Sequence, residues 1–141
     1  MIENNFIQSK VNSYYWKEDV NCATTTIKIL AEVFEIQINQ QVIDSALGMH
    51  GAGEYGAQCG LVEGTLMFLG IYGKHNNISN DIIIKSCNKF AKEFEEKFLS
   101  LQCSTLRPEG FKEDNPPHLC EPLTCNTVEF TIDFIKNINN Y

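Results

Sequence analysis

The chain has 141 residues, 43% of them hydrophobic, and a formal net charge of −7. This length predicts a single domain, 1–141, with a core of its own. The negative charge excludes nucleic acid as a partner, because phosphate binding needs clustered Lys and Arg. The longest apolar run, 61–72, is too short to cross a bilayer, so we expect no membrane insertion.

The start of the sequence and its six cysteines indicate a cellular compartment. Residues 1–6 contain no basic segment leading into an apolar one, so we expect no secretory signal. The sequence therefore predicts a cytoplasmic protein. In that reducing setting, cysteines serve as thiols, metal ligands or redox-active groups more often than as a disulfide scaffold.

Apolar residues at three- and four-residue spacing predict helices through the first part of the chain. A leading helix is expected over 1–17. A second helix, capped by Asp19 or Asn21, is expected to run to about residue 35. A shorter one covers 39–47 and is stopped by a glycine.

A glycine-rich bend, 50–56, is expected to lead into a central helix over 57–72, with Cys59 in its first turn. Three glycines recur at every fourth residue: Gly56, Gly60 and Gly64. They predict a row of small residues on one side of this helix. Such a row allows either the close approach of a neighbouring helix or space for a cofactor or disulfide beside the cysteine.

The second half predicts two helices separated by a loop. The longest helix is expected over about 81–103, with Cys103 at its end, and the proline-containing segment 104–119 is expected to be loop. A last helix starts near Pro122. The alternation within 130–134 also fits a strand, but the helical spacing is sustained longer. Together, the predicted elements form an all-α bundle of about five to six helices.

The cysteines divide into two groups by position. Cys22, Cys59 and Cys120 fall in or just before the first turn of a predicted helix. Unpaired backbone N–H groups and the helix dipole favour a thiolate there. Cys87 and Cys125 lie on apolar stripes and suit ordinary packing. The spacings match no compact zinc or iron–sulfur signature.

Other titratable residues lie close to these cysteines in sequence. His50 enters the glycine-rich bend, and His118 precedes Cys120 by two residues. Either histidine could orient or deprotonate a thiol, or be an ordinary surface residue. Glu63 follows Cys59 by one helical turn and could accept a proton or simply be solvated.

In combination, the motifs resemble those of the C_GCAxxG_C_C family of redox-active proteins over nearly the whole sequence. Asn-Cys-Ala at 21–23 is similar to the family's opening motif, and 51–64 is similar to its central glycine- and cysteine-containing segment. Leu61 departs from that segment by replacing a small alanine. Residues 103–106 resemble the third element, C-x-x-L.

The fourth family cysteine has two candidates in the sequence. Both Cys120 and Cys125 are followed three residues later by Leu or Val, as the fourth element requires. We choose Cys120 because it precedes the last helix, and Cys125 remains the alternative.

The resemblance implies a redox or metal-centred role. In the first interpretation, Cys59 is a low-pKa thiolate and Cys22 or another family cysteine resolves it as a disulfide. The protein would then be an oxidoreductase or electron-transfer component serving a redox partner, which the sequence does not identify. A homodimer is compatible with this role, since a subunit interface could complete the site.

Two other interpretations stay open. In the second, four cysteines hold an iron–sulfur cluster, in preference to zinc: Cys22, Cys59, Cys103 and Cys120. In the third, the chain is a non-catalytic helical interaction module whose cysteines only pack.

Overall fold

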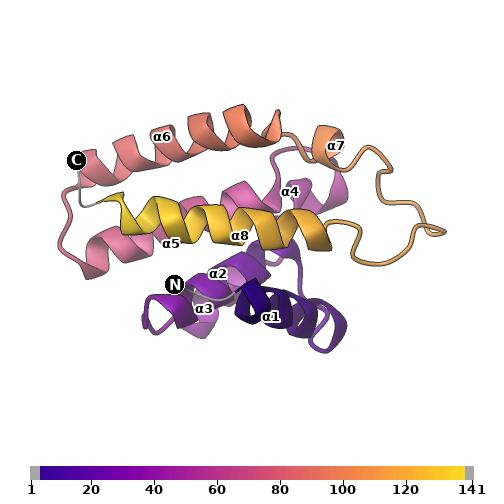
Figure 1. The fold of residues 1–141 in the computed structure, drawn as a ribbon, viewed down its shortest axis with the longest axis horizontal. Helices are drawn as coiled ribbons and strands as arrows, with labels where there is room; N and C mark the ends of the chain where they lie inside the picture. Colours follow the sequence, from indigo (N-terminus) through magenta and orange to yellow (C-terminus); the bar gives the residue numbers. More distant parts are fainter. Residues whose placement is uncertain (1–3, 139–141) are drawn as a thin grey trace.

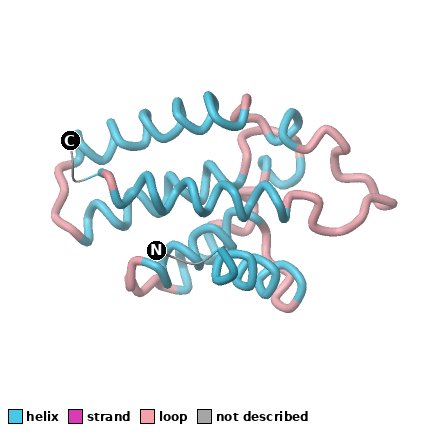
Figure 2. Tube along the Cα trace, viewed as in Figure 1, coloured by secondary structure: helices cyan, strands magenta, loops and turns pink. Residues whose placement is uncertain are grey.

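The computed structural model describes residues 4–138, and every element in that range is a helix or a loop (Figure 2). Five helices are long: α1 (Asn4–Trp16), α2 (Cys22–Val33), α5 (Gly60–His75), α6 (Asn80–Phe98) and α8 (Glu121–Lys136). Three are short: α3 (Gln40–Ser45), α4 (Gly51–Glu54) and α7 (Cys103–Leu106). The all-α prediction is confirmed. The described residues form eight helices instead of five to six because of the three short ones.

The long helices form three tiers (Figure 1). Helix α6 lies along one edge, α5 and α8 lie in the middle, and α1 and α2 lie along the opposite edge. Helix α2 packs on α5, and α1 packs on α8. Across residues 4–138, no helix combines the length and apolar character needed to span a membrane. The expected helix over 1–17 is α1, with residues 1–3 outside the described range.

Aromatic contacts hold α8 against α6. The Phe90 ring is fully buried and lies 5.7 Å from the Phe130 ring and 5.3 Å from the Phe134 ring, measured between centroids. The two α8 rings are four positions apart in the sequence, so they lie on one face of a helix. The strand interpretation of 130–134 is therefore wrong.

Two predicted helix boundaries are also wrong, for one reason. The central helix begins at Gly60 instead of residue 57, and the longest helix ends at Phe98 instead of residue 103. Leu99 then takes a left-handed conformation, with φ of 74°. The chain turns there, and 101–104 can pair with 56–59. Cys103 consequently begins a short helix and does not close the long one.

The row of glycines is shorter than predicted. Gly56 precedes α5 and has a φ of 97°, so only Gly60 and Gly64 lie on the helix. A Cβ atom on Gly64 would lie 2.6 Å from the Ala23 carbonyl oxygen of α2. Close approach of a neighbouring backbone therefore explains this glycine.

Candidate functional site

Four of the six cysteines line one pocket of about 580 Å³: Cys22, Cys59, Cys103 and Cys120. Two of them are the first residues of helices α2 and α7, and the other two immediately precede α5 and α8. Cys87 does not line this pocket, and Cys125 lines a separate hollow of about 480 Å³. Of the two candidates for the fourth family cysteine, the four-cysteine pocket contains Cys120.

A short antiparallel pairing brings the second and third pocket cysteines to the same place. The Cys59 N–H donates to the Leu101 carbonyl oxygen at 2.8 Å, and the Cys103 N–H donates to the Ala57 carbonyl oxygen at 2.7 Å. These bonds flank an isolated bridge between the two segments. Because both cysteines take part through their own backbones, their positions relative to each other are fixed by main-chain hydrogen bonds.

Two glycines leave the space that two of the sulfur atoms occupy. A side chain on Gly60 would overlap the Cys22 Sγ atom. A Cβ on Gly51 would lie 3.0 Å from both the Cβ and the Sγ of Cys103. All four residues of α4 have positive φ angles, Gly51 included, so this turn is left-handed and strongly favours glycine. The glycine-rich segment thus shapes the walls of the pocket.

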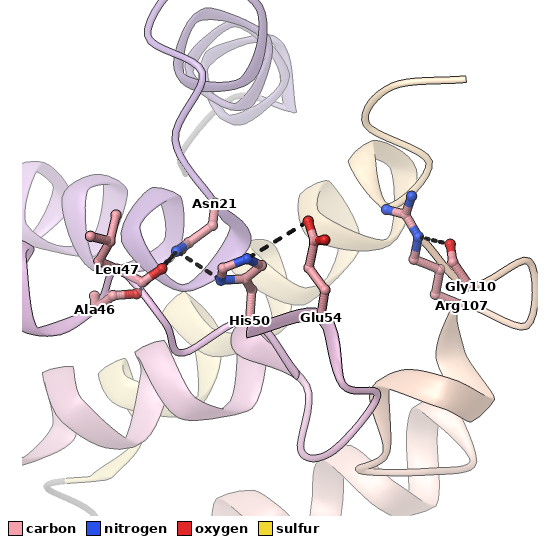
Figure 3. Close-up of polar contacts among 7 residues, drawn as sticks. All are labelled: Asn21, Ala46, Leu47, His50, Glu54, Arg107 and Gly110. Carbon is pink, nitrogen blue, oxygen red and sulfur yellow. Dashed lines mark hydrogen bonds and ion pairs between the residues drawn. The ribbon is translucent and has the colours of Figure 1, made fainter. Parts of the chain in front are cut away.

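Asn21 ties the start of α2 to the segment that precedes the glycines (Figure 3). Its Oδ1 accepts the Thr24 N–H at 2.9 Å, which caps the helix. Its Nδ2 lies 3.0 Å from the carbonyl oxygens of both Ala46 and Leu47, and 3.1 Å from Nδ1 of His50. One side chain therefore fixes the helix turn that begins with a pocket cysteine.

The two candidate histidines are engaged in contacts of their own. Nδ1 of His50 accepts from the Asn21 amide, and its Nε2 lies 3.9 Å from the Glu54 carboxylate (Figure 3). The His118 ring stacks on Tyr15 with 4.9 Å between centroids. Because an amide nitrogen only donates, the neutral His50 ring carries its proton on Nε2. This arrangement suits His50 to holding the pocket wall more than to deprotonating a thiol.

The prediction of a low-pKa thiol at Cys59 is wrong. Burial raises the pKa of Cys59 to about 12, and the neighbouring Cys103 reinforces the rise. Backbone N–H groups at the start of α5 lower this pKa but do not offset burial. Burial likewise raises the pKa of Cys22 far above its usual value, with Cys59 as the next cause. The loss of water around the sulfur outweighs the helix terminus.

Sequence reasoning missed Arg107, which lines the pocket and is the single arginine of the chain. Burial raises the pKa of both Cys103 and Cys120, and Arg107 opposes the rise at both. At Cys120 the charge of Arg107 is the largest influence on the pKa after burial. Its position one helical turn after Cys103 was the signal in the sequence that could have indicated it as a site residue. Tyr15 also lines the pocket.

The fit of a metal centre can be tested on the arrangement of these side chains. Four thiolates are a suitable donor set for an iron–sulfur cluster or zinc. Such sites need three or four ligands at about 2.3 Å from the metal. Within residues 4–138, no three His, Cys, Asp or Glu side chains are arranged to hold an ion. The positions of the thiols in this structure therefore do not fit a metal centre.

Replacing Asn21 with alanine is expected to lower the free energy of unfolding by about 1–2 kcal/mol, because a helix cap and its partners are lost. Asn39→Ala is the matched control, since Asn39 precedes α3 but makes no capping side-chain hydrogen bond. Urea unfolding of both variants measures the difference. Equal effects of the two substitutions would contradict the anchoring role given to Asn21.

Comparison with known proteins gives one family. The family model described as "Putative redox-active protein (C_GCAxxG_C_C)" matches residues 20–134, a range that includes all four pocket cysteines. No curated protein and no solved structure gives a match. The match covers most of the 141 residues and agrees with the motifs seen in the sequence. The chain therefore belongs to the C_GCAxxG_C_C family of redox-active proteins.

Proposed function

We propose that this protein is a thiol-based redox protein in which pocket cysteines alternate between dithiol and disulfide, with Cys22 and Cys59 as one reacting pair. The observation that carries this proposal is the convergence of four cysteines, from four separate helix starts, on one pocket of about 580 Å³. The other two cysteines of the chain lie elsewhere, so the convergence is selective.

The contacts around the pair support this function over simple packing. The Cys22 Sγ occupies the position where a side chain on Gly60 would lie, next to Cys59 in the chain. The pKa of Cys22 rises with the charge of Cys59 more than with that of the other two pocket cysteines. Both observations support Cys22 and Cys59 as a pair, because a disulfide requires its two sulfur atoms to lie within reach of each other.

The reaction is an exchange with an external disulfide, which supplies the oxidising equivalents. One pocket thiolate attacks one sulfur of that disulfide, forms a mixed disulfide and releases one thiolate, which takes up the proton that the pocket thiol has lost. A second pocket thiol then attacks the sulfur of the first and releases the second external thiol, and exchange within the pocket leaves the disulfide between Cys22 and Cys59. Two protein thiols are oxidised by two electrons, and one external disulfide becomes two thiols.

A thiol pair suits the arrangement better than a metal centre does. Disulfide exchange needs only two sulfur atoms within reach of each other, whereas an ion needs three or four ligands together. The described residues offer no such ligand group. We accordingly propose an oxidoreductase or electron-transfer component that works in a reducing compartment and exchanges electrons with a disulfide-bearing partner.

Counting free thiols under denaturing conditions tests this function. After anaerobic purification, all six cysteines are expected to titrate, and mild oxidation with a small disulfide should remove thiols in pairs. Peptide mapping is expected to find Cys22 joined to Cys59. In the Cys59→Ser variant, that disulfide should be absent, because serine forms no disulfide.

A double variant, Cys87→Ser with Cys125→Ser, is the matched control, because both cysteines lie outside the four-cysteine pocket. It should lose thiols on oxidation in the same pairs as the native chain. Bound iron with visible absorbance would favour the cluster interpretation instead. Six thiols inert to oxidation, with no metal, would leave a packing module.

A further inference from the structure

We propose that Cys120 is the entry thiol of the pocket, the one that first attacks an external disulfide, and that Arg107 is the positioning residue that makes it so. This assignment rests on the proposed thiol function and adds the order in which the pocket cysteines react. It divides the four sulfur atoms into an outer pair, Cys103 with Cys120, and an inner pair, Cys22 with Cys59.

Accessibility distinguishes Cys120 from Cys59 and Cys103. Cys59 and Cys103 are buried, with only 5% and 7% of their surfaces exposed. Cys22 is partly exposed as a residue, but its Sγ lies against Gly60. Cys120 is partly exposed and joins the long loop after α7 to the start of α8. Several residues between 107 and 118 of this loop line the pocket, and Figure 1 shows that the loop extends beyond the helical body.

Arg107 is held in a defined orientation beside this thiol. Its Nε donates to the Gly110 carbonyl oxygen at 2.7 Å (Figure 3), and its guanidinium carbon lies 4.2 Å from the centroid of the Phe111 ring. The hydrogen bond holds the edge of the planar guanidinium, and the ring contact holds its face. Among the four pocket cysteines, Cys120 is the one at which the Arg107 charge is the largest influence on the thiol pKa after burial.

At Cys103 the Arg107 charge also opposes the rise in pKa, but it ranks after burial and the charge of Cys120. The main influences on Cys22 and Cys59 are burial, the other cysteines and nearby backbone N–H groups. A cation on one side of the four sulfur atoms stabilises a thiolate on that side only. The outer pair is therefore the pair prepared for attack.

The entry step balances as an exchange. The Cys120 thiolate attacks one sulfur of an external disulfide, the external S–S bond breaks, and the leaving thiolate takes up the proton from Cys120. Cys103 then attacks the Cys120 sulfur and releases the second external thiol. The inner pair can reduce the resulting Cys103–Cys120 disulfide by the same exchange, which passes the oxidation inward with no further reagent.

Rates of modification resolved for each cysteine test the proposal. The reduced native protein is treated briefly with neutral iodoacetamide, or with bis(2-hydroxyethyl) disulfide, and each cysteine is quantified by peptide mass spectrometry. Cys120 is expected to react first among the pocket cysteines. Arg107→Gln is expected to slow Cys120 about tenfold, since the positive charge that favours its thiolate is lost. Arg107→Lys should restore most of the rate.

Lys112→Gln is the matched control, because Lys112 belongs to the same loop and lines the same pocket. It should leave the Cys120 rate within about twofold, as expected for an exposed charge that makes no direct contact with the thiol. In every variant, Cys125 serves as an internal reference outside the four-cysteine pocket. Far-ultraviolet circular dichroism shows whether each variant is folded.

Two results would overturn the assignment. One is the modification of Cys22 or Cys59 before Cys120 in the native protein, which needs no variant. The other is an equal slowing of all four cysteines in Arg107→Gln, which would indicate a general change of structure. If disulfides form but Arg107 has no effect on their order, only this assignment fails. If no disulfide forms, the proposed function itself fails.

Discussion

Replacing Gly64 with alanine is expected to lower the free energy of unfolding by about 1–3 kcal/mol, as overpacking of a close contact does. The added Cβ would lie 2.6 Å from the Ala23 carbonyl oxygen and 3.1 Å from its α-carbon. Both are backbone atoms, which cannot rotate away as a side chain can. Helices α2 and α5 must therefore move apart, and these helices begin at or just after Cys22 and Cys59. Urea unfolding measures the loss.

Gly70→Ala is the matched control in the same helix. A Cβ on Gly70 would meet no atom within 4 Å, and its backbone has no positive φ. Alanine there is expected to stabilise the protein by about 0.5–1 kcal/mol, because glycine is the poorer helix former. If Gly64→Ala were as stable as Gly70→Ala, the close packing of α2 on α5 would be contradicted.

The second large effect is a loss of stability at alkaline pH that depends on the pocket cysteines. In the folded protein, burial raises the pKa of Cys59 from 9.0 to about 12. Below about pH 9, the thiol is protonated in both states, and its contribution to stability is fully present. Above that pH, the unfolded chain loses the proton while the folded protein keeps it. Stability should fall by about 1.4 kcal/mol per pH unit for this thiol.

The other pocket thiols also have raised pKa values, so the measured slope should exceed that of one group. Urea unfolding between pH 7 and about pH 10, under argon with a reductant, measures it. Cys59→Ser should reduce the slope of stability against pH by about 1.4 kcal/mol per pH unit, the contribution of one proton, because serine does not titrate in this range. Cys87→Ser should reduce it less, since Cys87 is only half-buried. A stability that stays flat to pH 10 would contradict the burial of neutral thiols.

Local sequence signals predicted most of the long helices. Apolar spacing indicated α1, α2 and α8 to within a few residues, because each buries one face. The start of α2 is also marked by its capping asparagine and that of α8 by a proline in its first turn. The same signals failed at the start of α5 and the end of α6. Those boundaries depend on hydrogen bonds between 56–59 and 101–104, segments more than forty residues apart in the chain.

For the glycines too, the sequence predicted one part of their role and only the fold showed the other. Their spacing in the sequence predicted small residues at a close approach, which Gly64 fulfils against Ala23. Nothing in the spacing indicated that Gly60 and Gly51 leave room for the sulfur atoms of Cys22 and Cys103. Those contacts join segments that only the folded chain brings together.

The helical class and the family follow from the sequence alone, and its motifs predicted the four cysteines that line the pocket. These follow from residue types and spacings, which act over a few positions along the chain. The tertiary structure decided the sign of the pKa shift at Cys59 and the place of Arg107 beside Cys120. Desolvation and charge act through space, so their balance at a sulfur atom depends on which distant segments surround it.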